Sequence, residues 1–310
     1  TYHHTFSKKH ETRLGLDTQW KSNKIKGFNF LLPEYQSANY AIFAIHEFEP
    51  SQVNLWTLGL RFDYGTIDMK GYYDPNLYEF LIGNNQSEET ATSYAQRSQD
   101  LDRNFTSFNI RLGWDHQFND QFSSKINLGT AFRLPTAIEL GANGIHHGSF
   151  RHEQGDPNLD PEQGFMADVS LNYRENSWNI NLTPYAYFFN NYIFLRPSGT
   201  FSLLPHSGQL YKYTESEALL SGVELQVDKE LGRWHFGVAG EYIYNQQLTS
   251  NRSRNYPLPF TPANNVFTEV GYQLFTDSKI FNATEVSISN RSVMQQDRIA
   301  QGEEITPGYY

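Results

Sequence analysis

The residues of this chain that are best suited to ligand chemistry fall in two polar stretches near its middle. The first stretch carries His146, His147, Arg151 and His152, and imidazole groups of this kind bind zinc, iron or a metal chelate. Neighbouring side chains on an extended chain point to opposite faces, so His146 and His147 cannot readily chelate one ion together. Two interpretations therefore stay open: a metal site at His146, His147 and His152, or ordinary solvated loop residues.

The second stretch, residues 211–213, places a lysine between two tyrosines. Lys212 and Arg151 together offer positive charge for an anionic ligand such as a siderophore, because a guanidinium matches carboxylate oxygens in pairs. Ordinary loop aromatics and charges explain these residues equally well. The candidate ligand-binding residues are therefore His146, His147, Arg151, His152, Tyr211, Lys212 and Tyr213.

No enzyme motif accompanies these residues, and we predict no catalytic residue and no cofactor. The sequence lacks HEXXH, G-x-S-x-G, Walker A and G-x-G-x-x-G. Cysteine is absent, so neither disulfides nor thiolate metal sites are expected. A formal net charge of −10, with no basic cluster among the aromatic residues, argues against a nucleic-acid partner.

The segments that must position the candidate residues alternate between apolar and polar side chains. In residues 53–64, one face carries Trp56, Leu58, Leu60, Phe62 and Tyr64, and the other carries Thr57, Gly59, Arg61 and Asp63. The same period of two recurs in residues 105–118, 122–132, 165–173, 178–188, 219–227 and 234–244. This period is typical of β-strands, and about ten residues suffice for a tilted strand to cross a bilayer.

The alternation alone does not say which face is buried, and a soluble β-sandwich or propeller remains the alternative. Charged and amide side chains on the polar face favour a wet interior, since a dry core would have to pair each of them. The chain is 15% aromatic, with 20 Tyr and 23 Phe, yet only 38% hydrophobic, and its mean hydropathy is −0.60. Transmembrane barrels have this composition because only alternate strand residues meet lipid. We therefore predict an all-β fold, an antiparallel transmembrane β-barrel.

The expected connections between strands alternate in length. Tight turns are expected at residues 119–120, 175–176, 230–232 and 276–278, and long loops at 65–103, 134–162, 197–215 and 246–262. Short turns on one rim and long loops on the other are typical of outer-membrane barrels, with the short turns in the periplasm.

Residues 131–162 resemble a stretch of TonB-dependent outer-membrane receptors. In that family a strand ends in FR-x-P-x-x-x-EL, and the chain re-enters the barrel through G-[ND]-P-x-L-x-PE. The matching residues are Phe132, Arg133, Pro135, Glu139 and Leu140, and then Gly155, Asp156, Pro157, Asn158, Leu159, Pro161 and Glu162. Residues 31–47 are similar to receptors of the Bacteroidetes type, 256–262 to a late entry into the barrel, and 305–310 to the start of a strand.

The resemblance implies a 22-stranded barrel filled by an N-terminal plug, of which about eleven strands would lie in this chain. Residues 1–310 are then a partial β-barrel domain in which the plug and the final strands are absent. The implied function is TonB-coupled import of a scarce nutrient across the bacterial outer membrane, with an iron–siderophore or another metal chelate favoured. A carbohydrate or other non-metal nutrient, and a passive pore or adhesion barrel, are the alternatives. The implied partners are outer-membrane lipid and lipopolysaccharide, the TonB complex reached through the plug, and a small-molecule or metal-chelate ligand.

Overall fold

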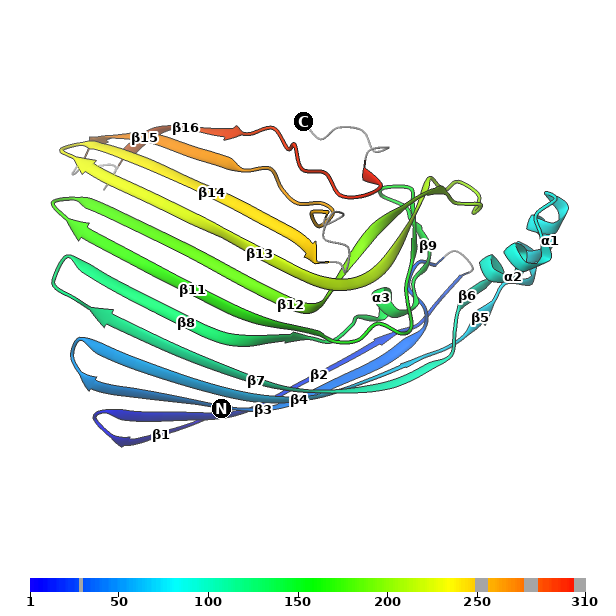
Figure 1. The fold of residues 1–310 in the computed structure, drawn as a ribbon, viewed down its shortest axis with the longest axis horizontal. Coiled ribbons are helices and arrows are strands. Elements are labelled where there is room, and N and C mark those ends of the chain that lie inside the picture. Colours follow the sequence, from blue (N-terminus) through cyan, green and yellow to red (C-terminus); the bar gives the residue numbers. More distant parts are fainter. Residues whose placement is uncertain (28–29, 249–255, 276–283, 304–310) are drawn as a thin grey trace.

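The computed structural model describes residues 1–27, 30–248, 256–275 and 284–303. Its main feature is a strongly curved antiparallel sheet in which each of twelve strands pairs with the next one along the chain (Figure 1). In order, these strands are β1 (Tyr2–Ser7), β2 (His10–Asn23), β3 (Tyr35–Ser51), β4 (Asn54–Met69), β7 (Leu101–Gln117), β8 (Phe122–Arg133), β11 (Glu162–Glu175), β12 (Trp178–Phe201), β13 (Gln209–Leu231), β14 (Trp234–Leu248), β15 (Asn265–Phe275) and β16 (Thr284–Val293). Within the described residues the sheet is an arc with β1 and β16 as its edges.

The apolar face of the sheet lies on the outside. On β4, Trp56, Phe62 and Tyr64 are 38%, 44% and 40% exposed, whereas Asp63 between the last two is 5% exposed. On the neighbouring strand β7, Leu112 is 42% exposed. A soluble sandwich would bury these aromatic and aliphatic side chains, so the exposure pattern excludes that alternative and agrees with a wall that faces lipid.

The polar face lines the hollow of the arc and satisfies its charges locally. Arg61 donates to both carboxylate oxygens of Asp63, at 2.8 and 2.9 Å, and to Asp17 at 3.1 Å. Asn127 donates to Asp168 at 2.7 Å. A cavity of about 620 Å³ is lined by Arg61, Asp63 and residues of the segment that follows β8. A wet interior accepts such groups at little cost.

Tight turns join the strands at one rim, close to the positions that the sequence indicated. Residues 118–121 separate β7 from β8, 176–177 separate β11 from β12, and 232–233 separate β13 from β14. Asn176, Ser177 and Gly232 have φ values of 47°, 65° and 62°, which tight hairpin turns require. The turn expected at 276–278 and the strand expected to start at 305 lie outside the described residues.

At the other rim, two of the connections are shorter than the sequence predicts. β4 continues to Met69 and β7 begins at Leu101, so the connection covers 70–100 and not 65–103. β12 continues to Phe201 and β13 begins at Gln209, which leaves residues 202–208 instead of 197–215. The strands extend beyond the part that faces lipid, where the backbone ladder continues but neither face has to be apolar. A prediction based on alternation therefore ends each strand early.

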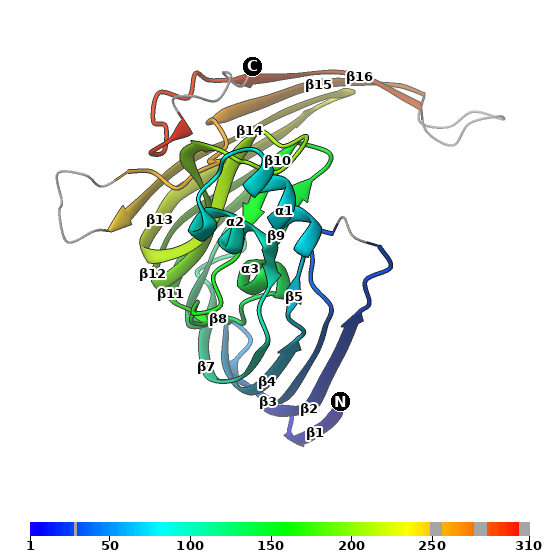
Figure 2. The ribbon, with the colours of Figure 1, turned by 90° about the vertical axis from the view of Figure 1, so that its right-hand side faces the viewer.

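The remaining connections fold into a layer at the loop rim. This layer contains β5 (Tyr72–Tyr73), α1 (Pro75–Gly83), α2 (Glu88–Ala95), β6 (Gln96–Ser98), α3 (Ala137–Gly141), β9 (Asn143–His146) and β10 (Arg151–Gln154). Helices α1 and α2 lie at the end of the molecule opposite the tight turns (Figure 1), and α3 and β9 lie over the hollow of the sheet (Figure 2). Leu77, Leu81, Ala91 and Leu204 pack into a small core that joins α1 and α2 to residues 202–208. Among the described residues, no helix is both long and apolar enough to cross a membrane.

Candidate functional site

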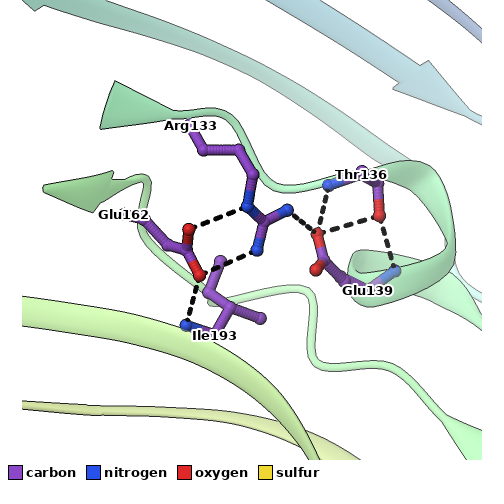
Figure 3. Close-up of polar contacts among 5 residues, drawn as sticks. All are labelled: Arg133, Thr136, Glu139, Glu162 and Ile193. Carbon is purple, nitrogen blue, oxygen red and sulfur yellow. Dashed lines mark hydrogen bonds and ion pairs between the residues drawn. The ribbon is translucent and has the colours of Figure 1, made fainter. Parts of the chain in front are cut away.

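An ion cluster with two buried carboxylates and a half-exposed arginine joins the loop layer to the sheet (Figure 3). Arg133, the last residue of β8, donates from Nε and Nη2 to the two oxygens of Glu162, at 2.8 and 2.9 Å. Its Nη1 donates to Glu139 on α3 at 2.8 Å. Glu139 and Glu162 are 8% and 7% exposed. A single guanidinium therefore neutralises two buried carboxylates, one of them in the paired geometry that planar guanidinium groups favour.

The same two carboxylates also bind backbone groups. Glu139 accepts from the Thr136 backbone N–H at 2.7 Å, and the Thr136 hydroxyl accepts from the Glu139 backbone N–H at 3.4 Å, which makes a capping box for α3. Glu162 accepts from the Ile193 backbone N–H on β12 at 2.8 Å. The cluster thus joins β8, α3, β11 and β12. The sequence motif contained Arg133, Glu139 and Glu162, but nothing in their spacing showed that they meet.

Gly155 lies where the chain returns from the loop layer to the ion cluster. A Cβ at this position would approach the Gly141 nitrogen and the Glu139 carbonyl oxygen to 2.6 and 2.7 Å, which are backbone atoms and cannot rotate away. We expect Gly155→Ala to destabilise the loop layer by about 1–3 kcal/mol, measured as faster proteolysis of residues 134–161 in the complete receptor. Gly148→Ala is the matched control, since its nearest contact is 3.6 Å. Equal proteolysis of the two variants would contradict this packing.

The second feature of the loop layer is a seam in which β10 lies parallel to β13. His152 pairs with Leu210, Glu153 with Tyr211, and Gln154 with Lys212. This pairing brings five of the predicted residues together, from two stretches that are far apart in the sequence: Arg151, His152, Tyr211, Lys212 and Tyr213. We call these residues, together with Glu153, the β10–β13 seam.

Arg151 is the half-buried cation of the seam. Its guanidinium lies over the rings of Tyr211 and Phe260, at 5.2 and 5.5 Å from their centroids. Nη2 donates to Glu153 at 3.0 Å, and Nε is buried without a hydrogen-bond partner in the described structure. Tyr213 also donates to Glu153, at 3.3 Å. Phe260 lies in a loop without periodicity, so the sequence pattern gives no sign of its role in the seam.

His152 is 2% exposed and both of its ring nitrogens are engaged. Nδ1 lies 2.8 Å from the Ser202 hydroxyl, and Nε2 lies 2.7 Å from Asn143 Oδ1. Because the Asn143 amide nitrogen donates to the Gln96 carbonyl, its Oδ1 is free to accept from Nε2. Burial, together with the positive charges of Arg97 and Lys212, lowers the pKa of His152 to about 4. His152 is therefore a neutral core residue at pH 7.

The other two candidate histidines lie apart from His152. His146 pairs with Arg151 across the β9–β10 hairpin and Ile145 pairs with His152, so His146 and His152 are on opposite faces. His147 lines a separate cavity beside α1. Nowhere in the described part of the chain do three or more His, Cys, Asp or Glu side chains form a group that could hold a metal ion. The metal site at His146, His147 and His152 stays a prediction that this geometry does not support.

Acidification should loosen the loop layer through His152. Its folded pKa of about 4 lies below the ordinary histidine pKa of 6.5, so between these values the unfolded state binds a proton that the folded state does not. Stability is then lost as the pH falls from 6.5 to 4, by about 3 kcal/mol. We expect hydrogen-exchange protection of β9 and β10 to fall over this range. His152→Gln should flatten the dependence and His147→Gln should not; parallel profiles for wild type and His152→Gln would refute the assignment.

An antiparallel sheet with its apolar face outward, a charged inner face and a folded loop layer at one rim defines part of the wall of an outer-membrane β-barrel. The chain belongs to the TonB-dependent receptor family, because the family model described as "TonB dependent receptor-like, beta-barrel" matches residues 2–310. Barrels of this family lie in the bacterial outer membrane, so the predicted fold, family and location are confirmed. The Bacteroidetes type stays a prediction.

Solved structures of other receptors share this fold. The chain is 18% identical to the copper transporter OprC, with a TM-score of 0.70. The match covers 96% of this chain and 42% of OprC. It is 15% identical to the Serratia marcescens hemophore receptor HasR, solved in complex with its hemophore HasA and heme, with a TM-score of 0.62. That match covers 88% of this chain and 48% of HasR. It is 14% identical to the alcaligin outer-membrane receptor FauA of Bordetella pertussis, with a TM-score of 0.54, and the match covers 88% of this chain and 41% of FauA. The chain thus spans less than half the length of these proteins, which are named as transporters and receptors and not as enzymes.

Proposed function

We propose that this chain is the barrel portion of a receptor that imports a metal chelate, such as an iron–siderophore, by TonB-coupled active transport. Family membership supports the receptor class. Similar structures include a copper transporter, a hemophore receptor bound to heme, and an alcaligin receptor, which favours a metal or metal chelate as the class of cargo. In this proposal, other parts of the receptor supply the plug and the remaining strands. Its partners are outer-membrane lipid and lipopolysaccharide, the TonB complex and the chelate.

The choice of an anionic chelate as the ligand depends on Arg151, which is partly exposed and has few hydrogen-bond partners. The Arg151 side chain is 28% exposed, and its guanidinium is stacked against two aromatic rings and has one carboxylate partner. A guanidinium has five N–H donors in a fixed plane, so Arg151 keeps donors for the carboxylate or other anionic oxygens of a chelate. Lys212 on the adjacent strand is exposed and adds a second positive charge. We therefore propose Arg151, Lys212 and Tyr213 as the residues of the seam that contact the ligand, with the buried Tyr211 supporting Arg151 from beneath.

The test is a titration of the complete receptor with ferric siderophores, heme and Zn²⁺. Arg151→Gln should weaken binding of an anionic ferric chelate about tenfold or more, since a charge-assisted pair is lost. Arg174→Gln is the matched control, because Arg174 is an exposed residue at the tight-turn end of β11. Unchanged affinity of Arg151→Gln would overturn the assignment of the seam.

Two further arms address the other interpretations. Replacing His146 and His147 with Gln, and leaving the buried seam residue His152 in place, should leave chelate affinity unchanged if the seam binds through Arg151, whereas a loss would support the metal site. Uptake that continues after the proton gradient is collapsed would point to a passive pore, and binding of a glycan without any ferric chelate would point to a carbohydrate receptor.

A further inference from the structure

Five separate segments of the loop layer meet around a cavity of about 270 Å³ beside α1. The segment before β3 contributes Phe30, α1 contributes Phe80, β6 contributes Arg97, and residues 204–206 contribute His206; His147 also lines the space. We call it the α1 cavity. It is distinct from the β10–β13 seam, because none of the seam residues lines it. In Figure 2, α1 lies at the front of the loop layer, close to β9.

Arg97 is the unusual group of this cavity. The residue is 4% exposed, and in the described part of the chain no carboxylate lies within ion-pair distance of it. Its hydrogen bonds go to backbone carbonyls: Nε donates to Asn143 at 2.7 Å, and Nη2 donates to Phe30 at 2.8 Å. Burial lowers the pKa of Arg97, and the negative charge of Asp74 opposes the shift. A buried cation without a paired anion is costly, and a group of this kind beside a cavity is a candidate for binding an anion.

The carboxylate of Asp74, which also lines the cavity, is engaged elsewhere. Its Oδ1 accepts from the backbone N–H groups of Asn76 and Leu77, both at 3.1 Å, and so caps α1. Of the five N–H donors that a guanidinium carries, Arg97 has partners for two among the described residues. Arg97 therefore has donors to offer an anion within the cavity.

The cavity wall also has an apolar part, made of Phe30, Leu77, Phe80, Ile145, Leu204 and Pro205, beside the polar residues Asp74, Asn76, His147 and His206. Phe30 lies with its ring 5.0 Å from the Arg97 guanidinium carbon, and Phe80 is 48% exposed although it is a large hydrophobic residue. A ligand that fits both features has a compact apolar body and one anionic group. A bare metal ion does not fit, because the described residues form no group of three suitable ligands. The volume, somewhat below that of a typical drug-sized pocket, suits a one-ring molecule.

We propose that the α1 cavity binds a small organic acid, with its carboxylate on Arg97 and its body between Phe30 and Phe80. The alternative is that Arg97 only anchors the backbone of Phe30 and Asn143. The two ideas differ in their consequences for ligands, since an anchor needs no carboxylate and makes no use of Phe80. The inference goes beyond the proposed import function, because it concerns a site that the seam residues do not line.

Benzoate is the probe, and the complete receptor in detergent is titrated by calorimetry and by saturation-transfer NMR. Benzoate should bind saturably, and benzyl alcohol, a neutral molecule of similar shape, should bind about tenfold more weakly or not at all. Arg97→Gln should abolish binding, and Arg97→Lys should restore only part of it because the planar fork is lost. Arg233→Gln, which removes a charge at the opposite rim, and Arg151→Gln in the seam should leave benzoate binding unchanged.

Phe80→Ala protects the test against misfolding, because the exposed Phe80 side chain contributes little to the core of the loop layer. This variant should weaken benzoate binding at least about tenfold while the protease pattern of the receptor stays that of wild type. The proposal is overturned if wild type shows no saturable binding up to about 10 mM benzoate, if benzyl alcohol binds equally well, or if Arg97→Gln retains full affinity. Since Arg151→Gln reports separately on chelate binding, a failure here leaves the proposed import function standing.

Discussion

Replacing Arg133 with alanine is expected to lower the free energy of unfolding of the complete receptor by about 3–5 kcal/mol. Glu139 and Glu162 would then be two buried carboxylates without their shared counter-charge. Repulsion between them should separate α3 from β11 and β12, because each glutamate is fixed to a different element. The measurement is urea unfolding followed by heat-dependent mobility on gels, together with proteolysis of residues 134–161.

Two controls isolate the charge from the loss of packing. Arg111→Ala removes an arginine that donates to a single neighbour, Asn127, at 2.8 Å, and should cost less than about 1 kcal/mol. Combining Arg133→Met with Glu139→Gln and Glu162→Gln should recover much of the stability, since no buried charge is left unpaired. If Arg133→Ala and Arg111→Ala cost the same, the cluster does not hold the loop layer.

Introducing arginine at Ile110 on the outer face of β7 should cost about 2–4 kcal/mol, the penalty for a charge facing lipid near the bilayer midplane. The pairing of β4 with β7 places this residue at that depth. Leu60 pairs with Ile110 midway between the pairs Trp56 with Trp114 and Tyr64 with Thr106. Aromatic side chains of this kind mark the two membrane interfaces. The measurement is the unfolding free energy of the receptor in lipid vesicles.

Asn109→Arg is the matched control, because Asn109 is the preceding residue of β7 and lines the inner cavity of about 620 Å³. An arginine there meets water and lies opposite Arg61 of β4. Because a like-charged cross-strand pair costs at most about 1 kcal/mol, we expect a change of about 1 kcal/mol or less. Equal penalties at residues 109 and 110 would contradict the assignment of the two faces.

Sequence reasoning succeeded best for the part of the chain that faces lipid. Between Trp56 and Tyr64, every second side chain is constrained to be apolar and the others are not, so the strand and its faces could be read directly. The turns at 119–120 and 175–176 followed from the same pattern, because each reverses the chain at the end of an alternating segment. The strands and turns could be predicted because they depend only on residues adjacent in the sequence and on which face of the sheet meets lipid.

The loop layer followed less well from the sequence, for a physical reason. Arg133 and Glu162 are brought together through space, and no periodicity marks such a contact. β10 has four residues and lies parallel to β13, so it lacks both the length and the alternation by which a strand is recognised. Arg97, His206 and Phe260 were missed for the same reason, and a family motif identified Glu139 without showing what it binds.

The most direct test of the account is the environment of single cysteines along β7, in a chain that contains none of its own. Residues 108 to 115 are replaced one at a time in the complete receptor, labelled with bimane and reconstituted with brominated lipids. Labels at 108, 110, 112 and 114 should be quenched by the lipid bromine, and those at 109, 111, 113 and 115 by a water-soluble quencher. If labels at residues 110 and 112 were quenched by the water-soluble quencher, or if quenching did not alternate along the strand, the outward orientation of the apolar face would be contradicted.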